Sequence, residues 1–106
     1  MKGLETLFGY KYNPDFKSLI NEGAIILDVR TKAEFDTGHI DTSINISHEQ
    51  LEKYISTLDK SKAIITCCET GMRSESAKRT LKSYGFERVY NAGNWGNLKK
   101  YFDEKN

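Results

Sequence analysis

The sequence is poor in the residues that would indicate a disulfide-rich, metal-binding or membrane protein. It has two cysteines among 106 residues, and because Cys67 and Cys68 are neighbours they cannot build a disulfide framework. No second group of cysteine or histidine completes a zinc site, so we expect no metal. No apolar run approaches the roughly 18 residues that a transmembrane helix needs. We therefore expect no membrane contact.

Neither sign of charge dominates the composition. The chain has 16 Lys and Arg against 15 Asp and Glu, which gives a formal net charge of +1. The basic residues are scattered and do not alternate with aromatic side chains, so we expect no nucleic-acid partner. The first residues lack the apolar stretch of a signal peptide, which predicts a cytoplasmic protein with reduced thiols. We also expect a monomer.

The length and composition suit a single domain, which we place over residues 1–106. One proline and eight glycines interrupt the chain, and 38% of the residues are hydrophobic, as in an ordinary globular domain. Four short apolar runs lie at residues 24–29, 44–46, 63–68 and 88–90. The first and third are nearly continuous in Ile, Leu, Val and Ala. Such runs are typical of parallel strands covered on both faces.

Helix start and stop signals separate these apolar runs. Asn13 is placed to cap one helix, and Thr31 and Ser47 each begin a capping-box spacing. Gly23 is placed to end the first helix, and Gly85 to end a longer one in a Schellman motif. A last helix should follow residue 94. Strands and helices that alternate in this way predict an α/β fold with helices flanking a central, mostly parallel sheet.

The stretch ITCCETGMRS at residues 65–74 is the most unusual part of the sequence. It leads from a predicted strand into a predicted helix, and such loops lie at the carboxyl edge of a parallel sheet, where ligands bind. The N–H groups and dipole of a helix start favour an anion, and a cysteine sulfur placed there becomes a reactive thiolate. Gly71 permits a close approach of the backbone, and Arg73 adds a positive charge and a forked donor.

Two registers of this loop imply different chemistry. Counted from Cys67, five residues precede Arg73, which is the spacing of the tyrosine-phosphatase nucleophile loop. Counted from Cys68, the pattern is Cys-x-x-Gly-x-Arg-Ser, and the glycine falls three residues after the cysteine, where the phosphatase pattern also has it. The shorter loop also forms a smaller cradle, suited to one sulfur atom rather than a phosphate. We favour Cys68 as the nucleophile.

The chain resembles the single-domain rhodaneses of the sulfurtransferase family. Three segments carry the likeness in the family's order: the loop motif at 68–74, ILDVRTKAEFDTGHIDTSINI at 26–46, and NAGNWGNLKKY at 91–101. The resemblance implies a rhodanese-like three-layer domain. It also implies that Cys68 takes a sulfane sulfur from thiosulfate or a thiol persulfide and passes it to a thiol or cyanide. The implied partners are a small-molecule or protein sulfur donor and a thiol acceptor, and no cofactor is needed.

The resemblance also assigns roles to individual residues. The persulfide would rest in the loop formed by Glu69, Thr70, Gly71, Met72, Arg73 and Ser74. Asp28 and Arg30 match a recurring pair, which we interpret as an ion pair that braces the loop; support of the next helix start is an equal alternative. Cys67 stands where the family usually has an aromatic residue. Strand alternation predicts that it points away from the loop as a small buried side chain, and a resolving thiol is the alternative.

At the position of Glu69, family members that use thiosulfate well have a basic side chain, which would help to hold the dianion. A carboxylate about 6 Å from a bound anion costs roughly 2–3 kcal/mol at an effective dielectric of about 20. We therefore expect thiosulfate to be a poor donor and a thiol persulfide or a protein to be the better one.

Two other functions remain open at this level. One is a small Cys-dependent phosphatase or arsenate reductase that acts through Cys67. The other is a non-catalytic rhodanese-like module that binds a protein partner, although the joint presence of Cys68, Gly71 and Arg73 argues against an inactive module. His39 we expect to be a structural hydrogen-bonding residue, because a thiolate at a helix start needs no base.

Overall fold

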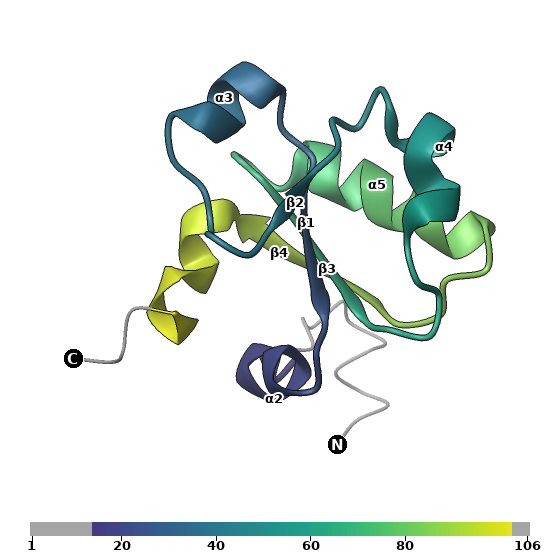
Figure 1. Cartoon of the computed structure of the whole chain (residues 1–106), viewed down its shortest axis with the longest axis horizontal. Helices are drawn as coiled ribbons and strands as arrows, with labels where there is room; N and C mark the ends of the chain where they lie inside the picture. Colours follow the sequence, from purple (N-terminus) through teal and green to yellow (C-terminus); the bar gives the residue numbers. More distant parts are fainter. Residues whose placement is uncertain (1–13, 103–106) are drawn as a thin grey trace, which may run out of the picture.

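The computed structural model describes residues 14–102, in which strands and helices alternate along the chain (Figure 1). The strands are β1 (Ile25–Asp28), β2 (Ile44–Asn45), β3 (Ile64–Cys68) and β4 (Val89–Asn94). The helices are α2 (Phe16–Asn21), α3 (Lys32–Asp36), α4 (Leu51–Tyr54) and α5 (Met72–Ser83), with 3₁₀ helices η1 (Ile55–Thr57) and η2 (Trp95–Tyr101). Over this part of the chain, no helix is long and apolar enough to cross a membrane.

The four strands form one sheet in the order β2-β1-β3-β4, and every neighbouring pair is parallel. All five residues of β3 are buried, and so are the last three of β1. These are the two strands that the continuous apolar runs predicted to be covered on both faces. The predicted α/β fold with a parallel sheet is therefore confirmed.

Two apolar clusters fill the space on the two faces of the sheet. On one face α4, η1 and α5 pack on the strands, and in Figure 1 α4 and α5 lie to the right of the sheet. On the other face α2 and η2 pack through Leu19 and Leu98. Strand alternation divides β3 between the clusters, with Ile64 and Cys68 in the first and Ile65 and Cys67 in the second. The two adjacent cysteines therefore belong to different layers.

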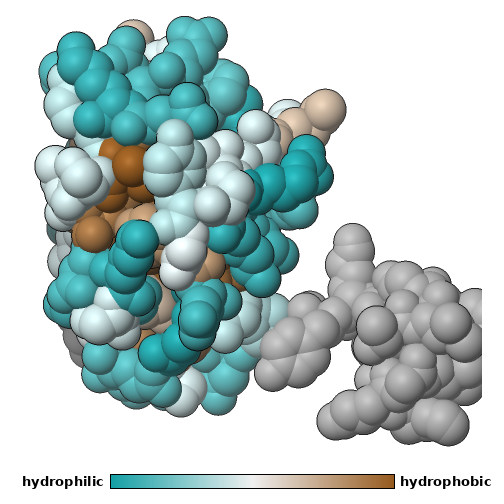
Figure 2. All heavy atoms as spheres, turned by 90° about the vertical axis from the view of Figure 1, so that its right-hand side faces the viewer, coloured by the Kyte–Doolittle hydropathy of each residue, from teal (hydrophilic) through white to brown (hydrophobic). Residues whose placement is uncertain are grey.

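The first cluster reaches the surface beside the end of α5. A shallow hollow there is lined by Ile55, Ser56, Leu58, Lys60, Tyr84 and Phe86. Figure 2 looks at the side of the molecule that carries α4 and the end of α5, and it shows a small apolar area among hydrophilic residues. Most of the apolar side chains of this layer are thus covered, as a stable core requires.

Local signals set most of the helix ends. Thr31 and Glu34 form the predicted capping box: the Thr31 hydroxyl accepts from the Glu34 N–H at 3.2 Å, and the Glu34 carboxylate accepts from the Thr31 N–H at 2.9 Å. α5 ends in the predicted Schellman motif. There Gly85 has φ +96°, and the Phe86 N–H donates to the Leu81 carbonyl at 3.1 Å.

Two predicted helix starts differ from the structure. The predicted cap Asn13 lies outside the described residues, and α2 begins at Phe16 with Asp15 as its cap, whose carboxylate accepts from the Ser18 N–H at 3.1 Å. The second capping box, from Ser47 to Gln50, does not form. Instead the Gln50 N–H donates to the Ser47 carbonyl at 2.8 Å in a tight turn, which leaves no side-chain cap on α4.

Candidate active site

The loop between β3 and α5 lies at the carboxyl edge of the sheet, as the sequence predicted. Cys68 is the last residue of β3, and α5 begins at Met72 after only three loop residues. Gly71 makes this tight connection possible, because its φ of +95° lies in the left-handed region that favours glycine. The loop therefore brings the first N–H groups of α5 back over the Cys68 side chain.

The Cys68 sulfur is buried and surrounded by donors. The Gly71 N–H donates to Sγ at 3.1 Å and the Ser74 N–H at 3.4 Å, while the Ser74 Oγ lies 3.2 Å away. Burial by itself raises the pKa of the Cys68 thiol. The Ser74 hydroxyl and the N–H groups of Ser74, Gly71 and Thr70 outweigh burial, so the pKa lies below its ordinary value. This environment stabilises a thiolate.

Cys67 lies in the opposite environment. Its side chain is fully buried in the second apolar cluster, on the face of the sheet away from the loop. Burial, and then the negative charge of Asp28, raise the pKa of the Cys67 thiol far above its ordinary value. Cys67 is thus the small buried side chain that strand alternation predicted, and an apolar environment of this kind keeps a thiol inert.

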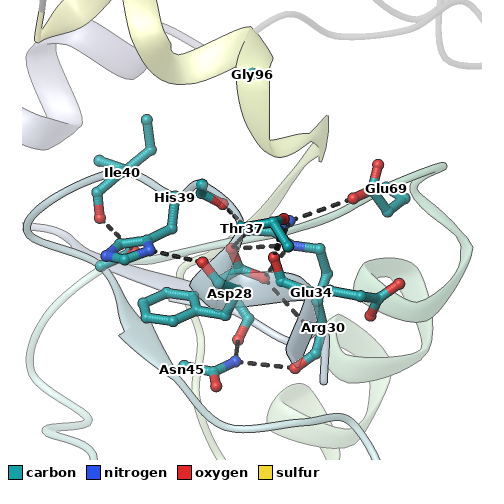
Figure 3. Close-up of polar contacts among 12 residues, drawn as sticks. Asp28, Arg30, Glu34, Thr37, His39, Ile40, Asn45, Glu69 and Gly96 are labelled. Carbon is teal, nitrogen blue, oxygen red and sulfur yellow. Dashed lines mark hydrogen bonds and ion pairs between the residues drawn. The ribbon is translucent and has the colours of Figure 1, made fainter. Parts of the chain in front are cut away.

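Asp28 and Arg30 form a buried ion pair at the end of β1. The Arg30 Nη2 lies 2.7 Å from Asp28 Oδ2, and the two side chains are 1% and 0% exposed. Figure 3 shows Arg30 between Asp28 and Glu69, and the remaining guanidinium nitrogen reaches the Glu69 carboxylate at 3.2 Å. The Asn45 amide donates to the carbonyls of both Asp28 and Arg30. The pair therefore connects β1 and β2 to the first residue of the loop.

The Arg73 side chain points to Glu34 on α3 and not into the loop. We expected its forked donor to serve the loop, but Nη1 and Nη2 donate to the two carboxylate oxygens of Glu34 at 2.8 and 3.1 Å. A fork that matches a carboxylate in this way is occupied. Arg73 thus joins α3 to the start of α5, and it contributes positive charge near Cys68 rather than a hydrogen bond to the sulfur.

The Glu34–Arg73 pair makes stability depend on acid pH. The hydrogen bond from Arg73, followed by the Thr31 N–H, lowers the pKa of Glu34 to about 2 from an ordinary 4.5. Because the folded pKa is the lower one, the stabilisation is complete above the ordinary pKa and is lost as the pH falls toward 2. Urea unfolding across this range should show a shallower pH dependence for Glu34→Gln, which retains the capping-box spacing. An identical dependence in both proteins would contradict the pairing.

The other residues of the motif form the rim of the loop. The Met72 side chain is 76% exposed, and Met72 is not among the residues that donate to the Cys68 sulfur. The Thr70 hydroxyl accepts from the Met72 N–H at 3.4 Å, and the Glu69 side chain is 45% exposed. The backbone of these residues forms the turn, and their exposed side chains border the entrance to the loop.

Two asparagines of β4 also hold the loop, and no sequence pattern predicted a role for them. Thr66 pairs with Asn91 and Cys68 with Asn94, so β4 contains one extra residue, a β-bulge, beside the loop. Asn94 donates to the Glu69 carbonyl at 2.8 Å, and Asn91 donates to the Gly71 carbonyl at 3.1 Å. Their position at the carboxyl end of a predicted strand was a signal for such a role, but the bulge between Asn91 and Asn94 could not be predicted from the sequence.

His39 has the structural role expected of it. Its Nδ1 lies 2.7 Å from the Phe35 carbonyl, and its ring stacks on the Phe35 ring at a centroid distance of 3.7 Å. Among the described residues no cluster of three or more His, Cys, Asp and Glu side chains forms a metal site.

Comparison with known proteins identifies the family. Residues 13–94 match the model of the rhodanese-like domain. The putative sulfur carrier protein YrkF of Bacillus subtilis is 38% identical over 71 residues, and the thiosulfate sulfurtransferase GlpE of Shewanella oneidensis is 34% identical over 65. These matches cover 67% and 61% of this chain, but only 38% and 64% of the two relatives.

The fold agrees with this result. The solved structure described as a rhodanese with anions from E. coli is 28% identical; the match covers 71% of this chain and 91% of that one, with a TM-score of 0.66. The region that the family model matches contains every strand of the sheet and the whole Cys68 loop. The chain therefore belongs to the rhodanese-like domain family, whose named relatives are sulfurtransferases and a sulfur carrier protein.

Proposed function

We propose that this chain is a sulfurtransferase in which Cys68 carries the transferred sulfur as a persulfide, and that a thiol persulfide is a better donor than thiosulfate. The observation that carries the proposal is the buried Cys68 sulfur with N–H donors from Gly71 and Ser74 at the start of α5. Those donors stabilise negative charge on sulfur before any substrate arrives.

The reaction has two steps. The first exchanges one S–S bond for another; the second breaks the S–S bond at Cys68 and forms a new S–S bond to a thiol or an S–C bond to cyanide. The Cys68 thiolate attacks the outer sulfur of a persulfide R–S–SH; the S–S bond of the donor breaks, and the thiol R–SH leaves with the proton. Cys68 then carries a persulfide, whose terminal sulfur is anionic. An acceptor thiolate or cyanide attacks that sulfur, the new S–S bond at Cys68 breaks, and the Cys68 thiolate is restored.

Charge around the loop supports the choice of donor. The group formed by buried Asp28, buried Arg30 and half-exposed Glu69 contains two carboxylates and one guanidinium, which leaves one net negative charge. Arg73 is paired with Glu34 and offers no free fork to a second anion. Thiosulfate is a dianion, so its approach is opposed by electrostatic repulsion that a singly charged or neutral donor feels less.

The two alternatives gain no support. Cys67, the nucleophile of a phosphatase register, is buried on the far face of β3 with a raised pKa. A non-catalytic module has no need of a nucleophile with surrounding donors, and Cys68 has them.

Sulfur loading tests the proposal directly. The protein is incubated with glutathione persulfide or with thiosulfate, and its intact mass is measured before and after cyanide. We expect a gain of one sulfur atom that cyanide removes, located on the Cys68 peptide. If neither donor adds sulfur, the loop is not a persulfide site and the non-catalytic module becomes the better explanation.

Replacing Glu69 tests the choice of donor. We expect Glu69→Gln to raise kcat/KM for thiosulfate roughly 3- to 10-fold and to leave the value for glutathione persulfide within about twofold, because the net negative charge beside the loop is removed. Glu87→Gln is the matched control, since it removes the same charge at an exposed site beyond the opposite end of β4. Comparable turnover of the wild-type protein with both donors would refute the argument.

A further inference from the structure

The Asn91 side chain makes four hydrogen bonds beside the Cys68 loop. Its Oδ1 accepts from the Gly93 N–H at 2.9 Å and from the Ser74 hydroxyl at 2.7 Å. Its Nδ2 donates to the Gly71 carbonyl at 3.1 Å and to the Glu75 carboxylate at 3.0 Å. This single side chain therefore connects β4, the loop and the first turn of α5.

The orientation of this amide is determined without reference to Ser74. Nδ2 faces a carbonyl and a carboxylate, which only accept, and Oδ1 faces the Gly93 N–H, which only donates. Rotating the amide by half a turn would replace these three hydrogen bonds by three repulsive contacts. Oδ1 carries no proton, so the proton of the 2.7 Å contact with Ser74 belongs to the Ser74 hydroxyl.

Ser74 has one hydroxyl proton and two neighbours that can accept it. Its Oγ lies 2.7 Å from Asn91 Oδ1 and 3.2 Å from Cys68 Sγ. While the proton points to Asn91, Oγ presents a lone pair to the sulfur, which suits an S–H donor and repels a thiolate. When the thiolate forms, the thiol proton leaves to water, and Ser74 must turn its own proton from Oδ1 to Sγ.

We propose that Asn91 is a positioning residue for sulfur transfer: by holding the Ser74 proton, it favours the thiol form of Cys68 and restrains the charge that the loop amides promote. The inference rests on the proposed role of Cys68. In the persulfide the negative charge lies on the outer sulfur, so the Ser74 proton returns to Asn91 and the cost of turning it is recovered. Asn91 therefore favours transfer of sulfur onto Cys68 over a resting thiolate.

Other charged or titratable groups surround the same loop and act together with this contact. They are Asp28 at the end of β1, Arg30 just after it, Glu34 on α3, Glu69 in the loop, and Arg73 and Glu75 on α5. Asn91→Ala retains all of these groups but removes the amide, together with its hydrogen bonds to Gly71, Glu75 and Gly93. It frees the Ser74 proton for the sulfur, and this lowers the apparent pKa of Cys68 by about 0.5 to 1.

The sign of this change separates the proposal from a merely structural role. A loosened loop would lose N–H donors to the sulfur, and that raises the pKa of Cys68. The experiment is a pH titration of the thiolate ultraviolet absorbance in a Cys67→Ala background, with and without Asn91→Ala, after subtracting the protein that lacks both cysteines. A fall in the pKa that disappears when Ser74→Ala is also present supports the proposal. An unchanged or raised pKa, or the same fall without Ser74, overturns it.

Ser74→Ala alone supplies a second test that holds even if Asn91→Ala does not fold. The Ser74 hydroxyl lowers the pKa of Cys68, so its loss should raise that pKa. If Asn91 holds the hydroxyl proton, the rise is less than about 0.3; if the proton is free to serve the sulfur, the rise is about 0.5 to 1. The titration needs no sulfur donor. Failure of sulfur loading would therefore count against the proposed function and leave this result to be judged separately.

Discussion

Sulfur transfer is expected to fall roughly 10³-fold or more when Cys68 is replaced by serine, because a hydroxyl cannot form a persulfide. The measurement is the initial rate of thiocyanate formation from cyanide with glutathione persulfide as the donor. The introduced hydroxyl would still accept the N–H groups that Gly71 and Ser74 now direct at the sulfur, so the loop should remain folded. The loss then reports on chemistry rather than on structure.

Cys67→Ser is the matched control for this experiment. Cys67 is the neighbouring thiol, but it lies in the second apolar cluster on the opposite face of β3. We expect its replacement to reduce stability, because a hydroxyl enters an apolar environment, while kcat/KM of the folded protein stays within about threefold. If instead Cys67→Ser abolished transfer and Cys68→Ser did not, the phosphatase register of the loop would be the correct one. Equal losses in both variants would indicate that Cys67 resolves the persulfide.

Arg30→Met is expected to cost about 3–5 kcal/mol of the free energy of unfolding, which is the largest stability effect that we predict. The variant has a similar length but leaves the fully buried Asp28 carboxylate without the guanidinium that donates to both of its oxygens. It also removes the hydrogen bond to the Gly38 carbonyl at 2.7 Å. Because a domain of this size has about 5–15 kcal/mol in total, a large part of its stability depends on one side chain.

Urea unfolding measures this cost, and Lys32→Met provides the comparison. Lys32 pairs with Asp36 at 3.0 Å, but its side chain is 81% exposed, so we expect a change of at most about 0.5 kcal/mol. The double variant Asp28→Leu with Arg30→Met removes the unpaired charge and should recover part of the loss. A cost below about 1 kcal/mol for Arg30→Met would contradict the importance of this ion pair for stability.

The sequence alone was a good guide at most positions where a short-range rule applies. The nearly continuous apolar runs at 24–29 and 63–68 became the two buried parallel strands, because a strand covered on both faces needs apolar side chains at most positions. Thr31 with Glu34 formed its capping box, and Gly85 its Schellman motif, because both depend on atoms within a few residues. The same kind of rule failed at Ser47, where a turn satisfied the backbone instead.

The ion-pair partners of charged side chains could not be predicted from the sequence. Arg73 and Glu34 are 39 positions apart, as are Arg30 and Glu69, and no local pattern couples them. Glu69 was expected to repel an anion as a lone carboxylate, whereas the structure pairs it with a buried guanidinium. Long side chains choose among several neighbours, and only the packing of α3, β1 and the loop decides which neighbour is within reach.

The loop motif, with the strand pattern before it and the helix pattern after it, was enough to indicate the family and the parallel sheet. The same patterns predicted that Cys68 lies at the carboxyl edge of the sheet and that Cys67 is buried away from the loop. These depend on spacing along one chain segment, which the sequence states directly. The tertiary structure alone decided that Arg73 pairs with Glu34 and that the Asn91 amide meets the Ser74 hydroxyl beside Cys68. These contacts join segments distant in the chain, and their distances and directions are set only when the layers pack together.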